Sequence, residues 1–353
     1  MDYSQFYIKE NVFRMKGLFL SLVLFLVFVS NQAIGQNKGC LLVVNKYDNT
    51  VSILDLNSNK EIISIQTGSG PHEVAVSENG KMAAVTNYGT QAPGNSVTII
   101  DVVNKKKVKE INLGEYQRPH GIEFLNNSEI IVTCEKQGAL IKVNIEDNKV
   151  DLLAKTDQRI GHMVAISKKK KYAYVANVLS GTVSKIDIKK AKFIDYLNFK
   201  KGIEGIEVSP DGKEVWVSNR YTSLVSVADA KTYDSIATMK ANKVAFRIKI
   251  SPNGKYAVVS NGESANISIY NAKQKKHIKD ISLFNLHTPT EQRPKDLPSV
   301  PVGIAFSNNS KHVFVACANY NLVAVIDTNS WELVNTIKTG NVPDGVYYSS
   351  INH

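Results

Sequence analysis

Residues 68–89, "GSGPHEVAVSENGKMAAVTNYG", decide the fold of this chain. The stretch holds two alternating apolar runs separated by a turn at 77–80, with His72 at the start of the first run and Asn87 at the end of the second. Alternation with a period of two on both sides of an Asn-Gly turn is the pattern of a β-hairpin. We therefore expect two antiparallel strands, with His72 and Asn87 at the same end.

The same hairpin recurs along the whole chain. With His72 as the marker, the equivalent positions are separated by 48, 42, 42, 42, 56 and 42 residues; they are His72, His120, His162, Glu204, Phe246, Val302 and Asp344. A period of about 42 residues with two insertions is the size of one propeller blade. In the repeat that starts at Phe246, four short strand-like runs cover residues 246–251, 256–261, 266–271 and 277–283.

Seven such units predict an all-β fold, the seven-bladed β-propeller. A four-stranded unit cannot bury both of its faces alone, whereas radial packing around a channel buries them and leaves only short edges. The first unit begins with a second, a third and an outer strand, "LLVVN", "TVSILD" and "EIISI", and the chain ends with a lone inner strand, "DGVYYS". We therefore expect the C-terminal inner strand to join the N-terminal blade and close the ring.

Residues 1–35 have the pattern of a signal peptide. A twelve-residue apolar run at 18–29 follows three basic residues and precedes small residues at 33 and 35, which predicts cleavage between Gly35 and Gln36. Residues 1–14 have the pattern of a mis-assigned extension, because Met15 begins a more ordinary signal sequence. The run is shorter than the roughly 20 apolar residues that a membrane span needs, so we expect no transmembrane anchor.

Residues 36–353 are then a single propeller domain, which we expect to be periplasmic, secreted or on the cell surface, and monomeric. A lipoprotein would use Cys40, but "NKGC" lies too far beyond the apolar run. Removing three basic and two acidic residues with the signal peptide leaves a net charge near +10, which by itself says little about function. The chain has three cysteines, an odd number that does not indicate a disulfide framework.

One short motif ends the second strand of most repeats. It is "VVN" at 43–45, "AVTN" at 84–87, "YVAN" at 174–177 and "VVSN" at 258–261, followed by runs such as "TVSILD" and preceded by turns such as "SPDGK". These repeats resemble the YVTN repeat of YncE-like propellers and surface-layer-type proteins. The resemblance covers the mature chain and implies an exported propeller, with DNA binding described for some members; Cys134 and Cys317 depart from it by replacing the Asn.

Ligand-capable side chains gather in two columns that should meet at one rim of the channel. The start of an inner strand and the end of the second strand lie on the same face of the disc, because neighbouring strands are antiparallel. The inner-strand column and the positions beside it supply His72, Glu73, His120, His162, Glu204, Arg247 and Asp344. The positions after the motif supply Tyr88, Glu135 and Arg220. Insertions at 88–95 and 283–300 fall on the same rim.

These residues are compatible with three hypotheses. Histidine is not favoured in strands, so its recurrence at the marker position needs an explanation. In the first hypothesis, the histidines are polar rim residues held by hydrogen bonds, and no ligand is involved. His72, His120, His162 and Glu204 have the chemistry to bind a divalent metal such as Zn²⁺ or Cu²⁺. A metal-free site would use a histidine as general base and the arginines Arg220 and Arg247 to hold an anion, as in a lyase or a lactonase-like hydrolase.

The opposite face of the disc should be basic. Lysines cluster at 105–107, 168–171, 189–190 and 273–276. Solvation and protection of strand edges explain such clusters without a partner. A scaffold or nucleic-acid-binding function is the alternative, although no aromatic residues interleave with these lysines to stack bases.

Overall fold

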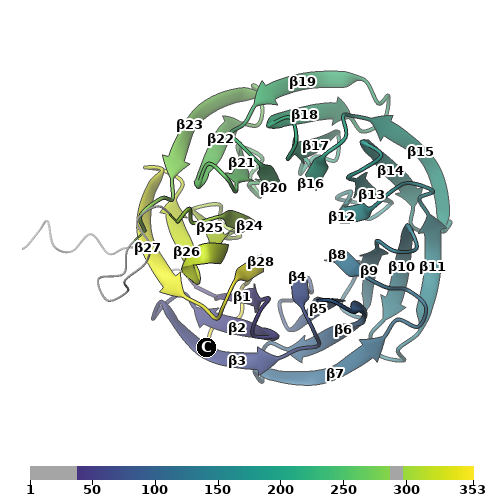
Figure 1. Ribbon diagram of the computed structural model, residues 1–353, viewed down its shortest axis with the longest axis horizontal. Coiled ribbons are helices and arrows are strands. Elements are labelled where there is room, and N and C mark those ends of the chain that lie inside the picture. The colour runs from purple at the N-terminus through teal and green to yellow at the C-terminus, as the bar shows by residue number, and fades with distance from the viewer. Residues whose placement is uncertain (1–37, 287–296) are drawn as a thin grey trace, which may run out of the picture. The chain divides into compact units, whose positions relative to one another are not determined.

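The computed structural model describes residues 38–286 and 297–353, and Lys38–His353 form one compact unit. This unit contains seven four-stranded antiparallel sheets arranged in a ring around a channel (Figure 1). The seven-bladed β-propeller is therefore confirmed. The expected signal peptide and much of the second insertion lie outside the described residues. Among the described residues, no helix has the length and apolarity to span a membrane.

The blades follow one another along the chain, each with its inner strand first. Blade 1 is β28 (Pro343–Ser349), β1 (Cys40–Asn45), β2 (Thr50–Asp55) and β3 (Lys60–Gln66). Blade 2 is β4 (Pro71–Val76), β5 (Met82–Gly89), β6 (Pro93–Asp101) and β7 (Lys106–Asn112). Blade 3 is β8 (Pro119–Phe124), β9 (Glu129–Cys134), β10 (Ala139–Asn144) and β11 (Val150–Lys155). Blade 4 is β12 (Gly161–Ile166), β13 (Tyr172–Asn177), β14 (Thr182–Asp187) and β15 (Lys192–Asn198).

The remaining blades have the same order. Blade 5 is β16 (Ile203–Val208), β17 (Glu214–Asn219), β18 (Leu224–Asp229) and β19 (Ser235–Lys240). Blade 6 is β20 (Ala245–Ile250), β21 (Tyr256–Asn261), β22 (Asn266–Asn271) and β23 (Lys276–Ser282). Blade 7 is β24 (Pro301–Phe306), β25 (His312–Cys317), β26 (Leu322–Asp327) and β27 (Glu332–Lys338), with the 3₁₀ turn η1 (Ala318–Tyr320) after β25.

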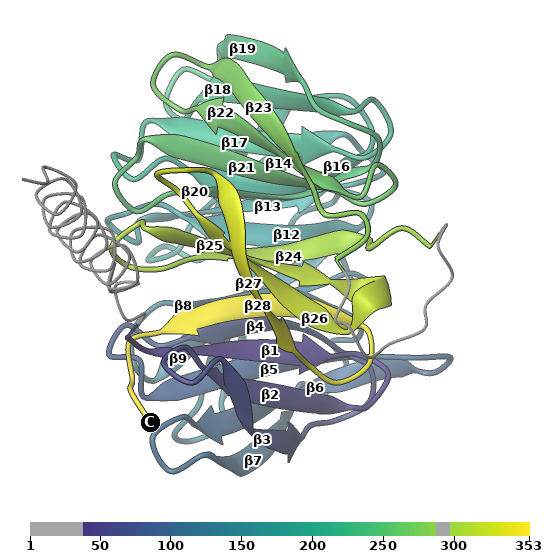
Figure 2. The same ribbon diagram turned by 90° about the vertical axis from the view of Figure 1, so that its left-hand side faces the viewer.

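The two ends of the described chain close the ring in one sheet. β28 pairs antiparallel with β1, with Leu42 opposite Tyr347 and Val43 opposite Val346. Figure 2 shows the two strands side by side. The predicted closure by the C-terminal inner strand is therefore correct, and it ties the last segment of the chain to the first blade.

Apolar side chains between adjacent blades form the core. Trp216 of blade 5 is fully buried in one cluster with Ala257 and Val259 of blade 6. Phe314 of blade 7 is buried with Leu41 of blade 1 in the same way. The faces that an isolated blade would expose are thus covered by its neighbours, as radial packing requires. The three cysteines are buried free thiols that pack in this core.

Every inner strand carries a β-bulge at the marker position. In blade 2, Pro71 is opposite Asn87 but Val74 is opposite Val85, so the inner strand gains one residue. The same shift occurs in the other six blades. A bulge re-aims side chains that would alternate between the two faces of a regular strand. It explains how His72 and Glu73, adjacent in sequence, both reach the channel.

A hydroxyl group clamps the bulge in four blades. Thr86 Oγ1 accepts a hydrogen bond from the Glu73 N–H at 3.1 Å and donates one to the His120 carbonyl of the next blade at 2.9 Å. Thr133, Ser218 and Ser260 make the equivalent pairs of contacts. This residue stands immediately before the Asn of the repeated motif or the Cys that replaces it. The motif therefore joins consecutive blades at the level of the markers.

Glycine follows the marker in four blades because the neighbouring inner strand approaches closely. A Cβ atom at Gly205 would lie 2.6 Å from the Phe246 carbonyl oxygen, and one at Gly121 would lie 2.7 Å from that of His162. Where the residue after the marker is glycine, neighbouring inner strands can therefore approach this closely. A larger residue there requires a shift of the backbone.

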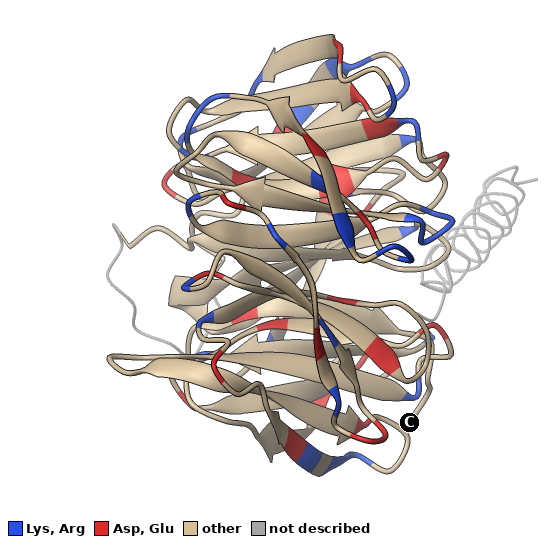
Figure 3. Cartoon of the chain, turned by 90° about the vertical axis from the view of Figure 1, so that its right-hand side faces the viewer, with Lys and Arg blue, Asp and Glu red and all other residues tan. Residues whose placement is uncertain are grey.

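Lysine and arginine positions occur in turns and outer strands, interspersed with Asp and Glu (Figure 3). Several lysines of the face that we expected to be basic are paired. Lys170 binds Glu78 at 2.9 Å, and Lys107 binds Glu110 at 2.8 Å. These pairs reduce the unbalanced positive charge on that face.

We predict that Thr86→Val destabilises the fold. The substitution keeps the shape of the side chain but leaves the Glu73 N–H and the His120 carbonyl without their partner, which costs about 1–3 kcal/mol. Chemical denaturation should show this loss in the free energy of unfolding, whereas Thr238→Val on the exposed side of β19 should change it by less than about 0.5 kcal/mol. Equal effects of the two substitutions would contradict the clamp.

Candidate functional site

The structure brings all ten predicted site residues together at one end of the channel. They form one network of contacts that we call the histidine cluster, and it lies inside the channel end, where half of its side chains are buried and the others are partly buried. Its members are His72, Glu73, Tyr88, His120, Glu135, His162, Glu204, Arg220, Arg247 and Asp344. The network also crosses the channel, since Arg247 of blade 6 binds Glu73 of blade 2.

His162 is held between two carboxylates. Its Nδ1 lies 2.5 Å from Glu135 Oε1, and its Nε2 lies 2.9 Å from Glu204 Oε1. Burial acts to lower the pKa of His162, but Glu204 and Glu135 together raise it to about 9. His162 is therefore an imidazolium at neutral pH, with each ring N–H donating to a carboxylate.

Two arginines complete this part of the cluster. Arg247 donates through Nε and Nη2 to Glu73 Oε1 at 3.1 and 2.5 Å, and its Nη1 lies 3.4 Å from Glu204 Oε1. Arg220 Nη1 donates to Glu204 Oε2 at 3.0 Å. Burial acts to raise the pKa of Glu204, but His162 and both arginines hold it well below its usual range.

The three histidines form a stack of rings. The ring centroids of His72 and His120 are 4.1 Å apart, and those of His120 and His162 are 3.6 Å apart. Tyr88 lies edge-on to His120 at 5.6 Å and donates its hydroxyl to Glu135 at 2.7 Å. His72 Nδ1 lies 3.0 Å from Asp344 Oδ2. Tyr88 therefore covers the stack from one side.

His120 is the member without polar partners. The side chain is buried, and neither ring nitrogen makes a hydrogen bond with another described residue. Burial and the positive charges of its neighbours, including His162, lower the pKa of His120 well below its usual value. A neutral imidazole with no hydrogen-bond partner thus lies between two other histidines.

The charges of the cluster balance when His162 is protonated. The carboxylates are Glu73, Glu135, Glu204 and Asp344, and the permanent cations are Lys46, Arg220 and Arg247. Buried charges are stable only when they are paired and hydrogen-bonded. The His162 imidazolium supplies the fourth positive charge that the four carboxylates require.

Two of the three permanent cations, Arg220 and Lys46, are more exposed than the carboxylates, whereas Arg247 is as deeply buried as they are. The side chains of Arg220 and Lys46 are 38% and 29% exposed, whereas those of Glu204 and Asp344 are 5% and 8% exposed. A molecule that enters from solvent therefore meets positive charge first. Lys46 also contacts His72 Nε2 at 3.1 Å and Asp344 at 3.5 Å.

Sequence reasoning missed Lys46 and Arg118. Lys46 follows Asn45 just as Tyr88 follows Asn87, so the repeat contained the signal that would have found it. Arg118 lies over the Tyr88 ring, 4.7 Å from its centroid, and donates to carbonyl groups of the first insertion, among them Thr90 O at 3.0 Å. The repeat could not predict these hydrogen bonds of Arg118, because they are made to the insertion and not to repeated positions.

The asparagines of the motif face away from the channel. Asn87 Nδ2 donates to the hydroxyls of Ser96 and Thr98 on the next strand, and Asn177 makes the equivalent pair of contacts. In contrast, Asn219 donates to two backbone carbonyls of the preceding connection. Their role is structural, and the side-chain donors of Asn87 and Asn177 bind hydroxyls on the next strand.

The geometry favours a metal set different from the predicted one. The atoms that come within 4.8 Å of one another belong to His72, Glu73 and His120, or to His120, Glu135 and His162. Glu204 belongs to neither group. Because both His162 nitrogens face carboxylates, a metal would first have to displace a proton from that ring.

Comparison with known proteins agrees with the fold. The family model "Lactonase, 7-bladed beta-propeller" matches residues 21–281. No curated protein matches significantly. Among solved structures, Kuenenia stuttgartiensis hydrazine synthase is similar, with a TM-score of 0.69 and 17% identity over 83% of this chain and 93% of the other. A functionally unknown protein from Desulfotomaculum acetoxidans DSM 771 has a TM-score of 0.70 and 13% identity over 88% and 99%. At these identities the two structures show the fold alone.

We predict that His162 makes stability depend on pH. The pKa of this group is raised on folding, so its contribution is complete below about 6.5 and is lost as pH rises through about 9. The free energy of unfolding should therefore fall across this window by an amount on the order of 3 kcal/mol. Urea denaturation at a series of pH values should show a smaller fall for His162→Gln, and an equal fall would show that His162 is not the titrating group.

Proposed function

The chain belongs to the lactonase seven-bladed β-propeller family, and we propose that it binds a small anionic molecule at the histidine cluster. The observation that carries the proposal is that two cations of the site are partly exposed, whereas its carboxylates are buried. The partly exposed Arg220 and Lys46 stand in front of buried carboxylates that are already paired. A carboxylate ligand can therefore take a charge-assisted hydrogen bond from either cation without entering an uncompensated negative environment.

Hydrolysis of a lactone is the second candidate, and two observations favour it. The family description names lactonases, and His120 is neutral and free to accept a proton. In this proposal His120 removes a proton from water, the resulting hydroxide attacks the lactone carbonyl, and the positive charges of His162 and Arg247 stabilise the oxyanion electrostatically. Collapse of the intermediate breaks the ring ester bond, and the alkoxide takes the proton back from His120 to give a hydroxy acid.

Access to His120 requires a movement of Tyr88. The Tyr88 ring packs against His72 and His120, and Glu135 holds its hydroxyl. Burial and the adjacent Glu135 raise the pKa of Tyr88, so it stays a neutral donor. When Tyr88 turns away, a ligand carboxyl or carbonyl group can take its place beside the histidines.

The other hypotheses remain proposals of lower rank. A Zn²⁺ or Cu²⁺ ion at the cluster would use His120 with His72 and Glu73, because His162 already donates to two carboxylates. We keep the resemblance to YVTN-repeat, YncE-like proteins and export to the periplasm or cell surface as proposals that rest on the sequence. A protein or nucleic-acid scaffold on the opposite face rests on the lysine clusters alone.

We predict that Arg220→Gln weakens the binding of a hydroxy acid about tenfold, because one charge-assisted hydrogen bond is lost. Lys46→Gln should have a similar effect. Isothermal titration with a small hydroxy acid, such as 4-hydroxybutyrate, measures the dissociation constant. Lys149→Gln, far from the channel end, serves as the matched control. Absence of binding to the parent protein, or unchanged affinity in both cluster variants, would exclude the anion site.

For lactone hydrolysis, we predict that His120→Gln lowers kcat by about 100-fold or more, the usual effect of removing a general base. KM should change by less than about threefold, because in this proposal His120 acts in the proton-transfer step and does not hold the lactone. The assay follows proton release from a panel of five- and six-membered lactones. If no lactone turns over while the hydroxy acid still binds, the protein is a binder and not a lactonase.

A further inference from the structure

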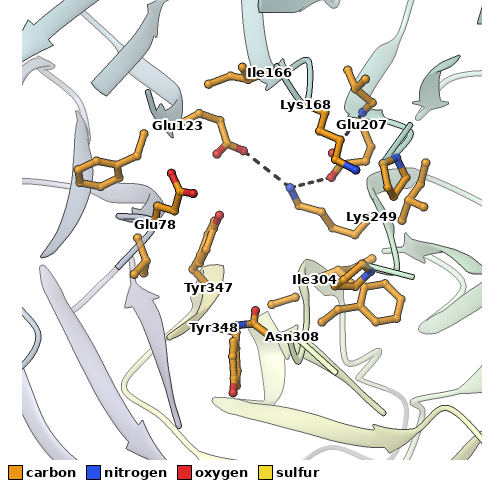
Figure 4. Close-up of a pocket in the computed structure, with 18 of the residues that line it drawn as sticks. Glu78, Glu123, Ile166, Lys168, Glu207, Lys249, Ile304, Asn308, Tyr347 and Tyr348 are labelled. Carbon is orange, nitrogen blue, oxygen red and sulfur yellow. Dashed lines mark hydrogen bonds and ion pairs between the residues drawn. The ribbon is translucent and has the colours of Figure 1, made fainter. Parts of the chain in front are cut away.

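The other end of the channel holds a second cavity. It has a volume of about 440 Å³, and its lining comes from the last residues of all seven inner strands and from the turns that follow some of them. Three residues after each marker, four blades place a polar side chain there; these are Glu123, Glu207, Lys249 and Tyr347 (Figure 4). We call them the inner tier. The corresponding positions in the other blades are alanines.

Only part of the inner tier is paired. Lys249 forms ion pairs with both glutamates, at 2.9 Å from Glu207 Oε2 and 3.9 Å from Glu123 Oε1, but only the first is within hydrogen-bond distance (Figure 4). Among the described residues, neither the Glu123 carboxylate nor the Tyr347 hydroxyl has a hydrogen-bond partner. Since Lys249 and Glu207 neutralise each other, Glu123 leaves one negative charge at the bottom of the cavity.

The rim of the cavity has the opposite charge. Lys170 is paired with Glu78 at 2.9 Å. Lys168, two residues beyond the end of β12, is exposed and has no ion-pair partner among the described residues. The cavity therefore has two carboxylates for one ammonium inside, and one ammonium without an ion-pair partner, that of Lys168, at its mouth.

An apolar belt separates these two charges. It is formed by the residue after each inner-tier position, including Phe124, Ile166, Ile250 and Phe306, of which Phe124, Ile250 and Phe306 are mostly buried between the blades and expose only a small part of their surface to the cavity. Lys168 is three residues beyond the inner-tier position of its strand, and three residues of strand span about 10 Å. The inner tier and the rim are therefore about 10 Å apart along the channel. The belt can cover an alkyl chain or a ring of that length.

The cavity is closed off from the histidine cluster. Between them lies a hollow of about 30 Å³, whose lining includes Glu73, Arg247 and Lys249. That volume holds roughly one water molecule. A ligand in the cavity therefore does not pass through the channel, and the two ends present separate sites.

From this layout we propose a second ligand site, which takes an aminocarboxylate whose two charged groups are separated by an apolar chain or ring. The ligand ammonium binds Glu123 and the Tyr347 hydroxyl oxygen. Its apolar middle lies against the belt, and its carboxylate reaches Lys168. This proposal does not depend on the function proposed for the histidine cluster.

Calorimetry with 6-aminohexanoate and the full chain tests the site. Hexylamine lacks the carboxylate and hexanoate lacks the ammonium, so each should bind at least about tenfold more weakly than the zwitterion. Glu123→Gln, which is isosteric, should lower the affinity about tenfold, and Lys168→Gln about threefold. Lys189→Gln on the same face should have no effect, and Arg220→Gln should leave this site intact while weakening anion binding at the histidine cluster.

Dependence on pH gives a second readout. Burial raises the pKa of Glu123 to about 7, and the charged groups that face it are Lys249, Glu207, Glu73 and Lys170. Protonation below that pKa removes the charge that attracts the ammonium, so the affinity should fall by up to about tenfold per pH unit in the parent but not in Glu123→Gln.

Three results would overturn the proposal. They are absence of binding at millimolar 6-aminohexanoate, equal affinity for hexylamine, and an affinity that Glu123→Gln leaves unchanged. Loss of binding in Arg220→Gln would also overturn it, because the ligand would then occupy the histidine cluster.

Discussion

The β-bulge of the inner strands is the constraint on which the site depends, and in four of the seven blades a hydroxyl clamp holds it. Thr86 satisfies a bulge N–H in its own blade and a marker carbonyl in the next blade, so one side chain fixes both the local geometry and the spacing of two blades. The bulge turns two consecutive side chains to the channel, where a regular strand would offer one. Without it, Glu73 and Arg247 could not face each other across the ring.

The charge network follows from that geometry. Side chains from blades on opposite sides of the channel become neighbours, and desolvation makes each unpaired charge expensive. The four carboxylates of the histidine cluster exceed its permanent cations by one, and a proton on His162 removes the excess. The same proton makes His162 a donor in both directions, which leaves His120 as the histidine with a free lone pair.

The repeat in the sequence was sufficient to predict the fold, the closure and the two columns, because period and strand direction alone decide which residues share a rim. It predicted that His162 and Glu204 would be near each other but not that Glu135 would bind the other nitrogen, since pairing depends on side-chain reach across a curved surface. Lys46 lay within the pattern and was overlooked. The inner tier, three residues further along each strand, was missed because alanines at three of its seven positions obscure the column.

The two ends of the channel differ in the number of charged side chains that the same inner strands contribute. Near the marker, the bulge brings many charged side chains together, and nearly every one of them has a partner. A ligand there must therefore replace contacts of Tyr88 or bind the more exposed cations, Arg220 and Lys46. Beyond the bulge the strands are regular, and seven positions share only four polar side chains. With fewer groups, the Glu123 carboxylate has no hydrogen-bond partner and shares Lys249 with Glu207. The Arg247–Glu73 pair, which spans the axis between them, separates a crowded, balanced site from an open, unbalanced one.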